Sequence, residues 1–234
     1  MSVSIVTTCK GRLHHLKQTV PLMCNQTHAN VEVIVVDYGD PDNCSDVLSV
    51  AHPNITCVRV KDNTDCFSPS RARNIGGRIA QGRNIAFVDG DIRLDDSWVT
   101  SCVDLINAGE GALILPAGKH TEITGTCMIT AELYRTIRGY GEDLTDWGYQ
   151  DWDLYNRAQA MDASVGYYSQ CLVKAIPNTD EERFGFYADR RKMYTGTRNK
   201  KISSRRGITN PDGYGLGEVE IIKDGKSLKN ITLK

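Results

Sequence analysis

Two aspartates stand one glycine apart directly after a short apolar run, in the segment IAFVDGD. Asp89, Gly90 and Asp91 would therefore follow the end of a buried strand. Asp and Gly are common turn residues, so a strand that ends in an ordinary turn explains the pattern. Carboxylate oxygens are also the ligands that hard divalent cations prefer, and a cation held by them could bind a phosphate. The pair by itself leaves both interpretations open.

A second acidic segment, DWGYQDWDLYNR over residues 146–157, alternates carboxylates with aromatic rings. Asp151 and Asp153 fall at the start of an expected helix, where acids stabilise the helix dipole. That role does not explain why Trp147 and Trp152 lie so close. Aromatic rings can stack on the C–H face of a sugar, carboxylates can accept hydrogen bonds from its hydroxyls, and one carboxylate can act as a general base. The segment therefore fits a sugar site.

The elements that must position these residues alternate along the first hundred residues. Apolar runs predict strands over 4–8, 31–37, 55–60 and 84–88, and helical spacing predicts helices over 14–24, 42–51 and 68–82. This alternation is typical of an α/β fold with a mostly parallel sheet and helices on both faces. Further along we expect helices over 95–107, 131–138 and 151–161, strands over 112–116, 126–130 and 164–173, and a hairpin turning at Asp224 and Gly225. We divide the chain into a domain of residues 1–190 and a basic C-terminal extension of residues 191–234.

In such a sheet, ligands bind beyond the carboxyl ends of the strands. Three of the predicted strands end in polar residues. The first ends in Thr7, Thr8 and Cys9, with Lys10 and Arg12 just after it; the second ends in Asp37 and Tyr38; the fourth ends in Asp89 and Asp91. These residues outline a crevice that suits a nucleotide bound with its metal. The helix after Ser68 carries Arg71, Arg73 and Asn74 in its first turns, where free N–H groups favour an anion. A solvated cationic face explains these arginines as well.

Composition narrows the class of protein. The 234 residues carry a formal net charge of −1, so the charge does not favour nucleic acid as a partner. No apolar run approaches the roughly 18 residues that span a bilayer, and the first residues lack the pattern of a signal peptide. The eight cysteines show no C-x-x-C spacing and do not cluster with histidines along the chain, so a zinc site is not expected. We expect a cytoplasmic protein with reduced thiols and no transmembrane segment.

At this point the sequence resembles a known family. Five segments in order, SIVTTCKGRLHHLKQT, VIVVDYGDPD, SPSRARNIGGRIA, FVDGD and WGYQDWDLYNRA, are similar to those of glycosyltransferases with the GT-A fold. The resemblance is to family 2, with a galactosyltransferase-type C-terminal region, and covers about residues 2–190. It implies a Rossmann-like GT-A domain and a metal-dependent, inverting transfer of sugar. The donor would be a nucleoside-diphosphate sugar, with a UDP-sugar favoured, and the acceptor a hydroxyl of a glycan or glycoconjugate.

The resemblance also implies roles for particular residues. Asp151 matches the catalytic base of inverting members, and Asp89 and Asp91 match the Asp-x-Asp pair that binds Mn²⁺ or Mg²⁺ at the donor diphosphate. The residues that would bind the nucleotide or donor are Thr7, Cys9, Arg12, Asp37, Tyr38, Arg71, Asn74, Asp89 and Gly90. Those that would meet donor and acceptor sugars are Trp147, Gly148, Gln150, Trp152 and Asp153. Basic residues of the C-terminal third, Arg183, Arg190, Arg191 and Lys192, could form a lid over the diphosphate.

The sequence also departs from the family pattern. Tyr149, Gln150 and Trp152 replace Gly, Glu and Asp of the galactosyltransferase-type segment, so the identity of the donor sugar is left open. Asn178 stands where relatives often carry a metal-binding His, and its carbonyl could serve a hard cation instead. His120 is not expected to be a ligand. Two rival interpretations stay open, a sugar nucleotidyltransferase and a non-catalytic protein that binds nucleotides or glycans.

Overall fold

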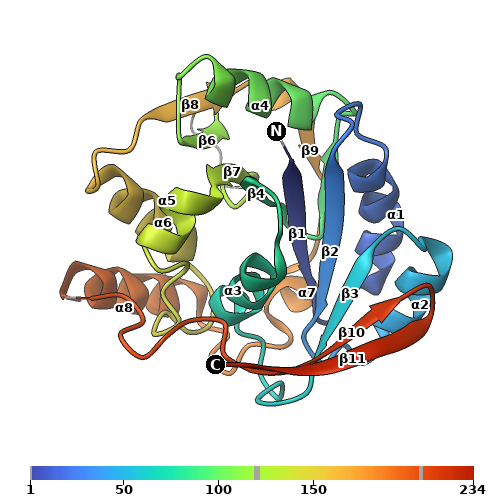
Figure 1. The fold of residues 1–234 in the computed structure, drawn as a ribbon. Helices are drawn as coiled ribbons and strands as arrows, with labels where there is room; N and C mark the ends of the chain where they lie inside the picture. The colour runs from blue at the N-terminus through green and yellow to red at the C-terminus, as the bar shows by residue number, and fades with distance from the viewer. Residues whose placement is uncertain (1, 119–121, 206–207) are drawn as a thin grey trace.

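A computed structural model describes residues 2–118, 122–205 and 208–234, and His120 lies outside these ranges. Within them, one nine-stranded sheet runs through the molecule in the order β11-β10-β3-β2-β1-β4-β7-β6-β8 (Figure 1). The strands are β1 (Val3–Cys9), β2 (Val31–Asp37), β3 (Thr56–Val60), β4 (Asn84–Phe87), β6 (Leu113–Pro116), β7 (Cys127–Thr130), β8 (Val165–Tyr168), β10 (Gly217–Lys223) and β11 (Lys226–Leu233). The first four are parallel and sit at the centre, with Val6 of β1 opposite both Ile34 and Phe87. The expected α/β fold with a mostly parallel sheet is confirmed.

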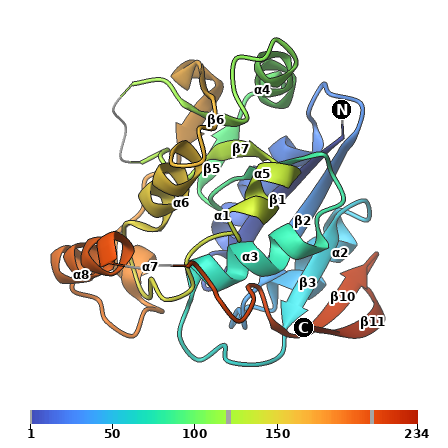
Figure 2. The same ribbon diagram turned by 60° about the vertical axis from the view of Figure 1, so that its left-hand side comes forward.

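Helices cover both faces of this sheet, as Figures 1 and 2 show. Those that contribute to the cores are α1 (Leu13–Cys24), α2 (Cys44–Ala51), α3 (Pro69–Ile79), α4 (Trp98–Asn107), α5 (Ala131–Thr136) and α6 (Gln150–Gln159). Two further helices in the described ranges, α7 (Asp180–Phe184) and α8 (Lys192–Arg205), contribute no residue to either core. Side chains alternate between the faces of a strand, so neighbouring residues enter different cores. Ile5 packs in the core under α1, α2 and α4, whereas Val6 packs in the core under α3, α5 and α6.

Helix α3 illustrates how the sequence fixes an element beside the strand ends. Ser68 lies before it in an extended conformation, and its hydroxyl accepts a hydrogen bond from the backbone N–H of Arg71 at 3.4 Å. Pro69 occupies the first turn, where a missing N–H costs nothing. Ala72 and Ile75 bury the apolar side of the helix against the sheet. The polar side, which carries Arg73, is thereby turned toward the end of β4.

The segment 164–173 does not form the single strand that its apolar content predicts. Strand β8 ends at Tyr168, and a short 3-10 helix, η1 (Gln170–Leu172), turns the chain away from the sheet. Strand β9 (Val173–Ala175) then pairs with β5 (Ile92–Leu94) in a separate two-stranded sheet. The prediction of one continuous strand is therefore wrong, because residues 169–172 form no strand and Val173 begins a different one.

The C-terminal hairpin forms as predicted, with both turn residues in the left-handed region (φ 48° at Asp224 and 66° at Gly225). Its strand β10 also pairs antiparallel with β3, so residues 217–233 belong to the main sheet. Val219 and Ile221 enter the core on one face and Ile222 the core on the other. Between the domain and the hairpin lies α8, which the sequence did not predict. No helix in the described part of the chain is both long and apolar enough to span a membrane.

Candidate active site

A cavity of about 310 Å³ opens beyond the carboxyl ends of β1 and β4. It is walled by the turn after β1, the loop after β4, the start of α6 and the segment around α7. Of the residues predicted from the sequence, the cavity is lined by Arg12, Asp89, Gly90, Asp91, Trp147, Gly148, Gln150, Asp151 and Trp152. The structure therefore brings the Asp-x-Asp pair and the tryptophan segment, about 60 residues apart in sequence, to one place.

The two aspartates after β4 face this cavity with different surroundings. Asp91 accepts hydrogen bonds from Arg12 Nη1 at 3.1 Å and from the Asn178 side-chain amide. Burial, followed by the neighbouring charge of Asp89, raises the pKa of Asp91, while Arg12 opposes that rise. Asp89 is more exposed, with 31% of its side chain accessible. A buried carboxylate such as Asp91, with a second carboxylate close by, favours a cation beside it.

This donor set fits a hard divalent cation such as Mn²⁺ or Mg²⁺, because carboxylate oxygens from Asp89 and Asp91 share one partly open cavity. Asn178 lies next to Asp91 as the sequence suggested, but it presents its amide nitrogen. Its carbonyl oxygen accepts a hydrogen bond from Arg183 Nε at 3.0 Å. To serve as a third ligand, the Asn178 side chain would have to turn over.

Arg73 connects the two acidic segments. Its Nη2 lies 2.6 Å from Asp89 Oδ1, and its Nη1 lies 3.5 Å from Asp151 Oδ1. Only 11% of the side chain is exposed, and the guanidinium stacks over the Tyr140 ring at 5.1 Å. Burial disfavours its charge, but Asp151 and Asp89 more than offset this and raise the pKa of Arg73. Arg73 is thus a fixed cation between the two carboxylates.

Asp151 lies in the first turn of α6. Tyr149, the residue before the helix, has a φ of 74°, and this left-handed conformation turns the chain into the helix. The Oδ1 atom of Asp151 is buried and has no hydrogen-bond partner in the part of the chain that the structure describes. Burial is the largest cause of a raised Asp151 pKa, Arg73 lowers that pKa, and Asp89 raises it. A carboxylate at a cavity wall, with a raised pKa and an oxygen that contacts Arg73 as an ion pair but accepts no hydrogen bond from the described residues, is suited to accept a proton.

Helix α8 holds the loop that carries Trp147. Asn199, fully buried on α8, donates hydrogen bonds to the carbonyls of Thr145 at 2.9 Å and Gly148 at 2.8 Å. Gly148 has φ 101°, and a Cβ there would lie 3.1 Å from the Cα of Gly196. The close approach of loop and helix therefore needs a glycine, and it places the Trp147 ring at the cavity.

Of the four basic residues of the predicted lid, two lie at or near the cavity and two lie on the surface away from it. Arg183 lines the cavity, and Lys192 Nζ lies over the Trp147 ring at 5.0 Å. Arg190 donates to the Gly185 carbonyl, and Arg191 forms an ion pair with Asp189 at 2.7 Å, both on the surface. A closing lid therefore stays a prediction for Arg183 and Lys192, and these contacts give it no support at Arg190 and Arg191.

Several predicted nucleotide ligands lie outside the cavity lining: Thr7, Cys9, Asp37, Tyr38, Arg71 and Asn74. Asp37 is buried and accepts a hydrogen bond from Ser45 N at 3.3 Å. Arg71 donates to the Tyr38 hydroxyl at 2.9 Å. Asn74 donates to the Tyr140 carbonyl at 2.9 Å. These contacts hold neighbouring loops in place, and nucleotide binding by this group stays a prediction.

Asp153, expected at the sugar, also lies outside the cavity lining. Its carboxylate accepts hydrogen bonds from Arg157 Nε at 2.9 Å and from the Ser203 hydroxyl at 2.5 Å, and only 1% of the residue is exposed. The arrangement gives no support to a sugar contact, because the carboxylate is turned into the contact between α6 and α8.

With this geometry established, the family of the chain can be assigned. Residues 4–164 match the model of the family described as "Glycosyl transferase family 2", which is more than half of the chain. The protein belongs to glycosyl transferase family 2. The resemblance seen in the sequence is thereby confirmed.

Named relatives share this domain over part of their length. The chain is 33% identical over 100 residues to the Escherichia coli UDP-Glc:alpha-D-GlcNAc-diphosphoundecaprenol beta-1,3-glucosyltransferase WfaP. The matched region is 42% of this chain and 37% of WfaP. It is 36% identical over 106 residues to the Pasteurella multocida hyaluronan synthase, covering 44% of this chain and 11% of the synthase. The chain thus spans well under two thirds of either relative.

Solved structures share the fold at low sequence identity. The Staphylococcus aureus TarS structure in complex with UDP-GlcNAc superposes with a TM-score of 0.62 at 16% identity, over 75% of this chain and 57% of that one. The mannosyltransferase PcManGT from Pyrobaculum calidifontis, in complex with GDP-Man and Mn²⁺, superposes with a TM-score of 0.68 at 14% identity. The superposition covers 89% of this chain and 66% of PcManGT. The GT-A fold of this family 2 protein is therefore shown.

The cavity also contains residues that the sequence did not single out for a role in it. They include Phe67, Glu122, Thr124, Gly125, Glu182, Phe186 and Tyr187. Glu182 carried a detectable signal, because Thr179 and Glu182 have the spacing of a capping box and form one at the start of α7. Backbone and side-chain hydrogen bonds from Thr179 lower the pKa of Glu182 to about 2. The remaining residues reach the cavity through loops that carry no periodic pattern.

Proposed function

We propose that this protein is a metal-dependent, inverting glycosyltransferase. It would move a sugar from a nucleoside-diphosphate sugar, with a UDP-sugar favoured, to a hydroxyl of a glycan or glycoconjugate. One observation carries the proposal: Asp151 and the Asp89–Asp91 pair face the same cavity, with Arg73 within 3.5 Å of both segments. A proton acceptor and two candidate metal ligands thus face one cavity.

The donor end would be held by charge. Arg12 and Arg183 line the cavity near Asp91 and can bind the diphosphate oxygens. Asp89 and Asp91 would hold Mn²⁺ or Mg²⁺, which when bound offsets the negative charge that develops on the leaving diphosphate. The PcManGT complex, which contains GDP-Man and Mn²⁺, supports such a pairing of nucleotide sugar and divalent metal on this fold.

The acceptor end would be served by Asp151. Its carboxylate takes the proton of the acceptor hydroxyl while that oxygen attacks the anomeric carbon from the face opposite the diphosphate, so the configuration inverts. The raised pKa of Asp151 makes it a stronger proton acceptor than an ordinary aspartate. The rings of Trp147 and of the half-exposed Trp152 offer flat surfaces for a sugar on the same wall.

The preference for uridine rests on relatives. WfaP is named for UDP-Glc, and TarS has been solved with UDP-GlcNAc and with UDP. PcManGT binds GDP-Man, so the fold accommodates either base. The altered Tyr149, Gln150 and Trp152 leave the donor sugar open.

Calorimetric titration with UDP and GDP, in Mn²⁺ and in a chelator, tests the donor half of the proposal. UDP should bind more tightly than GDP, and Mn²⁺ should strengthen binding in the parent but not in Asp91→Asn. Asp104→Asn, at an exposed acid on α4, is the matched control and should behave as the parent. Equal affinity with and without Mn²⁺ would contradict the metal role. Tight binding without hydrolysis or transfer of any UDP-sugar would favour a non-catalytic binding protein.

A further inference from the structure

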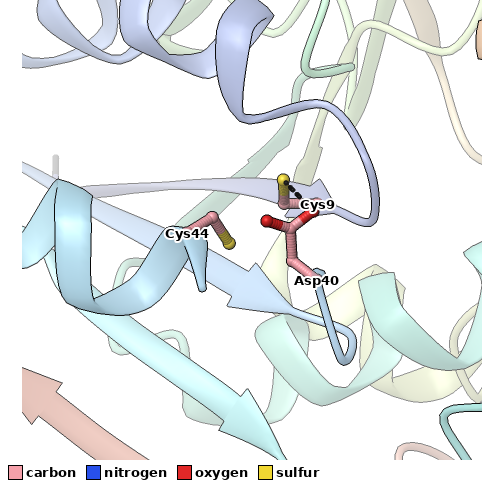
Figure 3. Close-up of side chains that lie close together, drawn as sticks. All are labelled: Cys9, Asp40 and Cys44. Carbon is pink, nitrogen blue, oxygen red and sulfur yellow. Dashed lines mark hydrogen bonds between the residues drawn. The ribbon is translucent and has the colours of Figure 1, made fainter. Parts of the chain in front are cut away.

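Three metal-binding side chains converge beneath the turn after β1, outside the candidate active site. Cys9 is the last residue of β1, Asp40 lies in the loop after β2, and Cys44 is the first residue of α2 (Figure 3). One ligand atom from each lies within 4.8 Å of the others. Both cysteines are fully buried, and Asp40 is 6% exposed. The fold has therefore brought the Cys9 sulfur to Asp40 and Cys44, which lie more than 30 residues further along the chain.

Asp40 has one satisfied and one unsatisfied oxygen. Oδ1 accepts hydrogen bonds from Cys9 Sγ at 3.4 Å and from the backbone N–H of Gly11. Oδ2 is buried and has no hydrogen-bond partner among the described residues. In Figure 3 the oxygen that is not bonded to Cys9 is turned toward Cys44. A buried carboxylate oxygen without a partner is costly, and a cation at this point would satisfy it.

Neither simple core packing nor a disulfide uses all three side chains. A packed core of small apolar thiols would not need an aspartate with an unsatisfied oxygen at its centre. A Cys9–Cys44 disulfide would use the two sulfurs but leave Asp40 Oδ2 buried without a partner. Cation binding uses all three groups at once, because two sulfurs and one oxygen are a ligand set that Zn²⁺ accepts.

We propose that Cys9, Asp40 and Cys44 form a binding site for a thiophilic divalent cation, with Zn²⁺ as the reference ion. The site is separate from the Asp89–Asp91 pair, whose oxygen ligands favour harder ions, and it does not depend on the proposed transfer activity. On binding, each S–H bond gives way to an S–metal bond, two protons leave to solvent and no electron is transferred. Three protein ligands leave the fourth tetrahedral position to water.

The site would act on the neighbouring cavity through one bond. Asp40 Oδ1 holds the N–H of Gly11, whose φ of 69° turns the chain between Lys10 and Arg12. Both of these cations line the cavity. A metal that fixes Asp40 would therefore fix the turn that positions them, in the manner of a structural cross-link between β1 and α2.

Cobalt is the probe of choice, because thiolate-to-cobalt charge transfer in the near ultraviolet reports sulfur ligands and is silent for carboxylates and imidazoles. Cobalt bound at the Asp89–Asp91 pair, or at the group of His14, His15 and Glu182 that could also hold an ion, would therefore give no such signal. The 234-residue chain is stripped of metal, kept reduced with a phosphine and titrated with Co²⁺, then with Zn²⁺. We expect one charge-transfer signal that Zn²⁺ abolishes, with two protons released per Zn²⁺ bound.

Cys44→Ala should lose the signal, while Cys102→Ala, which removes an equally buried thiol on α4, should keep it. Asp40→Asn retains an acceptor for Gly11 and should weaken the signal. Zn²⁺ should raise the melting temperature of the parent and of Cys102→Ala but not that of Cys44→Ala. Absence of the signal in the parent, or its persistence in Cys44→Ala, would overturn the proposal. Should Cys44→Ala fail to fold, the parent titration and Asp40→Asn still decide it.

Discussion

Arg73 Nη1 lies 3.5 Å from Asp151 Oδ1, so the residue proposed as the base shares its cation with the residue proposed as a metal ligand. Asp151 and Asp89 come from different elements, and Arg73 reaches both from α3. Anything that changes the charge at Asp89, including a bound cation, therefore changes the proton affinity of Asp151. The two halves of the site are electrostatically linked.

Replacing Arg73 should raise the pKa of Asp151, because the charge of Arg73 is the largest influence that lowers this pKa against burial. The carboxylate must be ionised to act as a base, so in Arg73→Gln the acid limb of the rate profile should move to higher pH. The unpaired carboxylates should also lower the free energy of unfolding, by up to about 3–5 kcal/mol. Rates measured across pH, with melting curves beside them, test both effects.

Arg73→Lys keeps the charge but not the two-pronged geometry, so its acid limb should shift less. An unchanged limb in Arg73→Gln would rule out the link.

Asp151→Asn should abolish most transfer while leaving the fold intact. A general base contributes roughly 10²–10⁴-fold in rate, and the amide keeps the size of the side chain. Donor affinity and melting temperature should stay close to those of the parent. Asp153→Asn is the informative contrast, because it disturbs the buried contact with Arg157 and Ser203 and should lower stability more than donor affinity. A parent-like rate in Asp151→Asn would mean that another group accepts the proton.

Gly125 tests the position of Asp89 without altering its charge. A Cβ at Gly125 would lie 2.3 Å from Asp89 Oδ2, so Gly125→Ala must displace that carboxylate. We expect a loss of Mn²⁺-dependent nucleotide affinity with a largely unchanged melting curve, measured by calorimetry and circular dichroism. In Gly196→Ala the new carbon lies 3.8 Å from the Trp147 ring, which is ordinary contact, and Mn²⁺ dependence should persist. Equal Mn²⁺ dependence in the two variants would remove Asp89 from the metal site.

The sequence predicted the elements that pack through apolar side chains better than those that pack through polar ones. Strand and helix alternation through β4 followed from apolar periodicity, because those elements bury apolar faces. Helix α8 escaped prediction because its buried residues, Thr195 and Asn199, are polar and leave no apolar stripe. Asp89, Asp91 and Asp151 stood out as charges at predicted element ends. The link through Arg73 did not, since a guanidinium in the first turns of a helix also fits a solvated face.

The hairpin should contribute stability through its inward side chains. Ile221 on β10 is 5% exposed and packs in the core under α3, so Ile221→Ala should lower the free energy of unfolding by about 2–5 kcal/mol. Leu228 on β11 is 57% exposed, and Leu228→Ala should change it by no more than about 0.5 kcal/mol. Urea denaturation measures both. Equal, small effects would mean that the hairpin packs loosely against the sheet.

His15 should make the fold sensitive to mild acid. Burial, followed by the charges of His14 and Arg12, lowers the pKa of His15 from 6.5 to about 4. A histidine whose pKa is lowered on folding favours the folded state fully above 6.5, and this stability is lost as the pH falls from 6.5 through about 4. His15→Gln cannot titrate, so its melting temperature should fall less over that interval. Parallel curves for parent and variant would exclude His15 as the cause.

The pairing of β10 with β3 has a consequence for biosynthesis. Val60 meets its partner Val219 only after roughly 160 further residues have been made. At about 5–20 residues per second, β3 would spend on the order of 10–30 s on the ribosome as an open edge with unpaired backbone groups. Nascent chains should therefore depend on chaperones during that interval, and pairing of β10 with β3 would end the exposure of this edge to wrong partners.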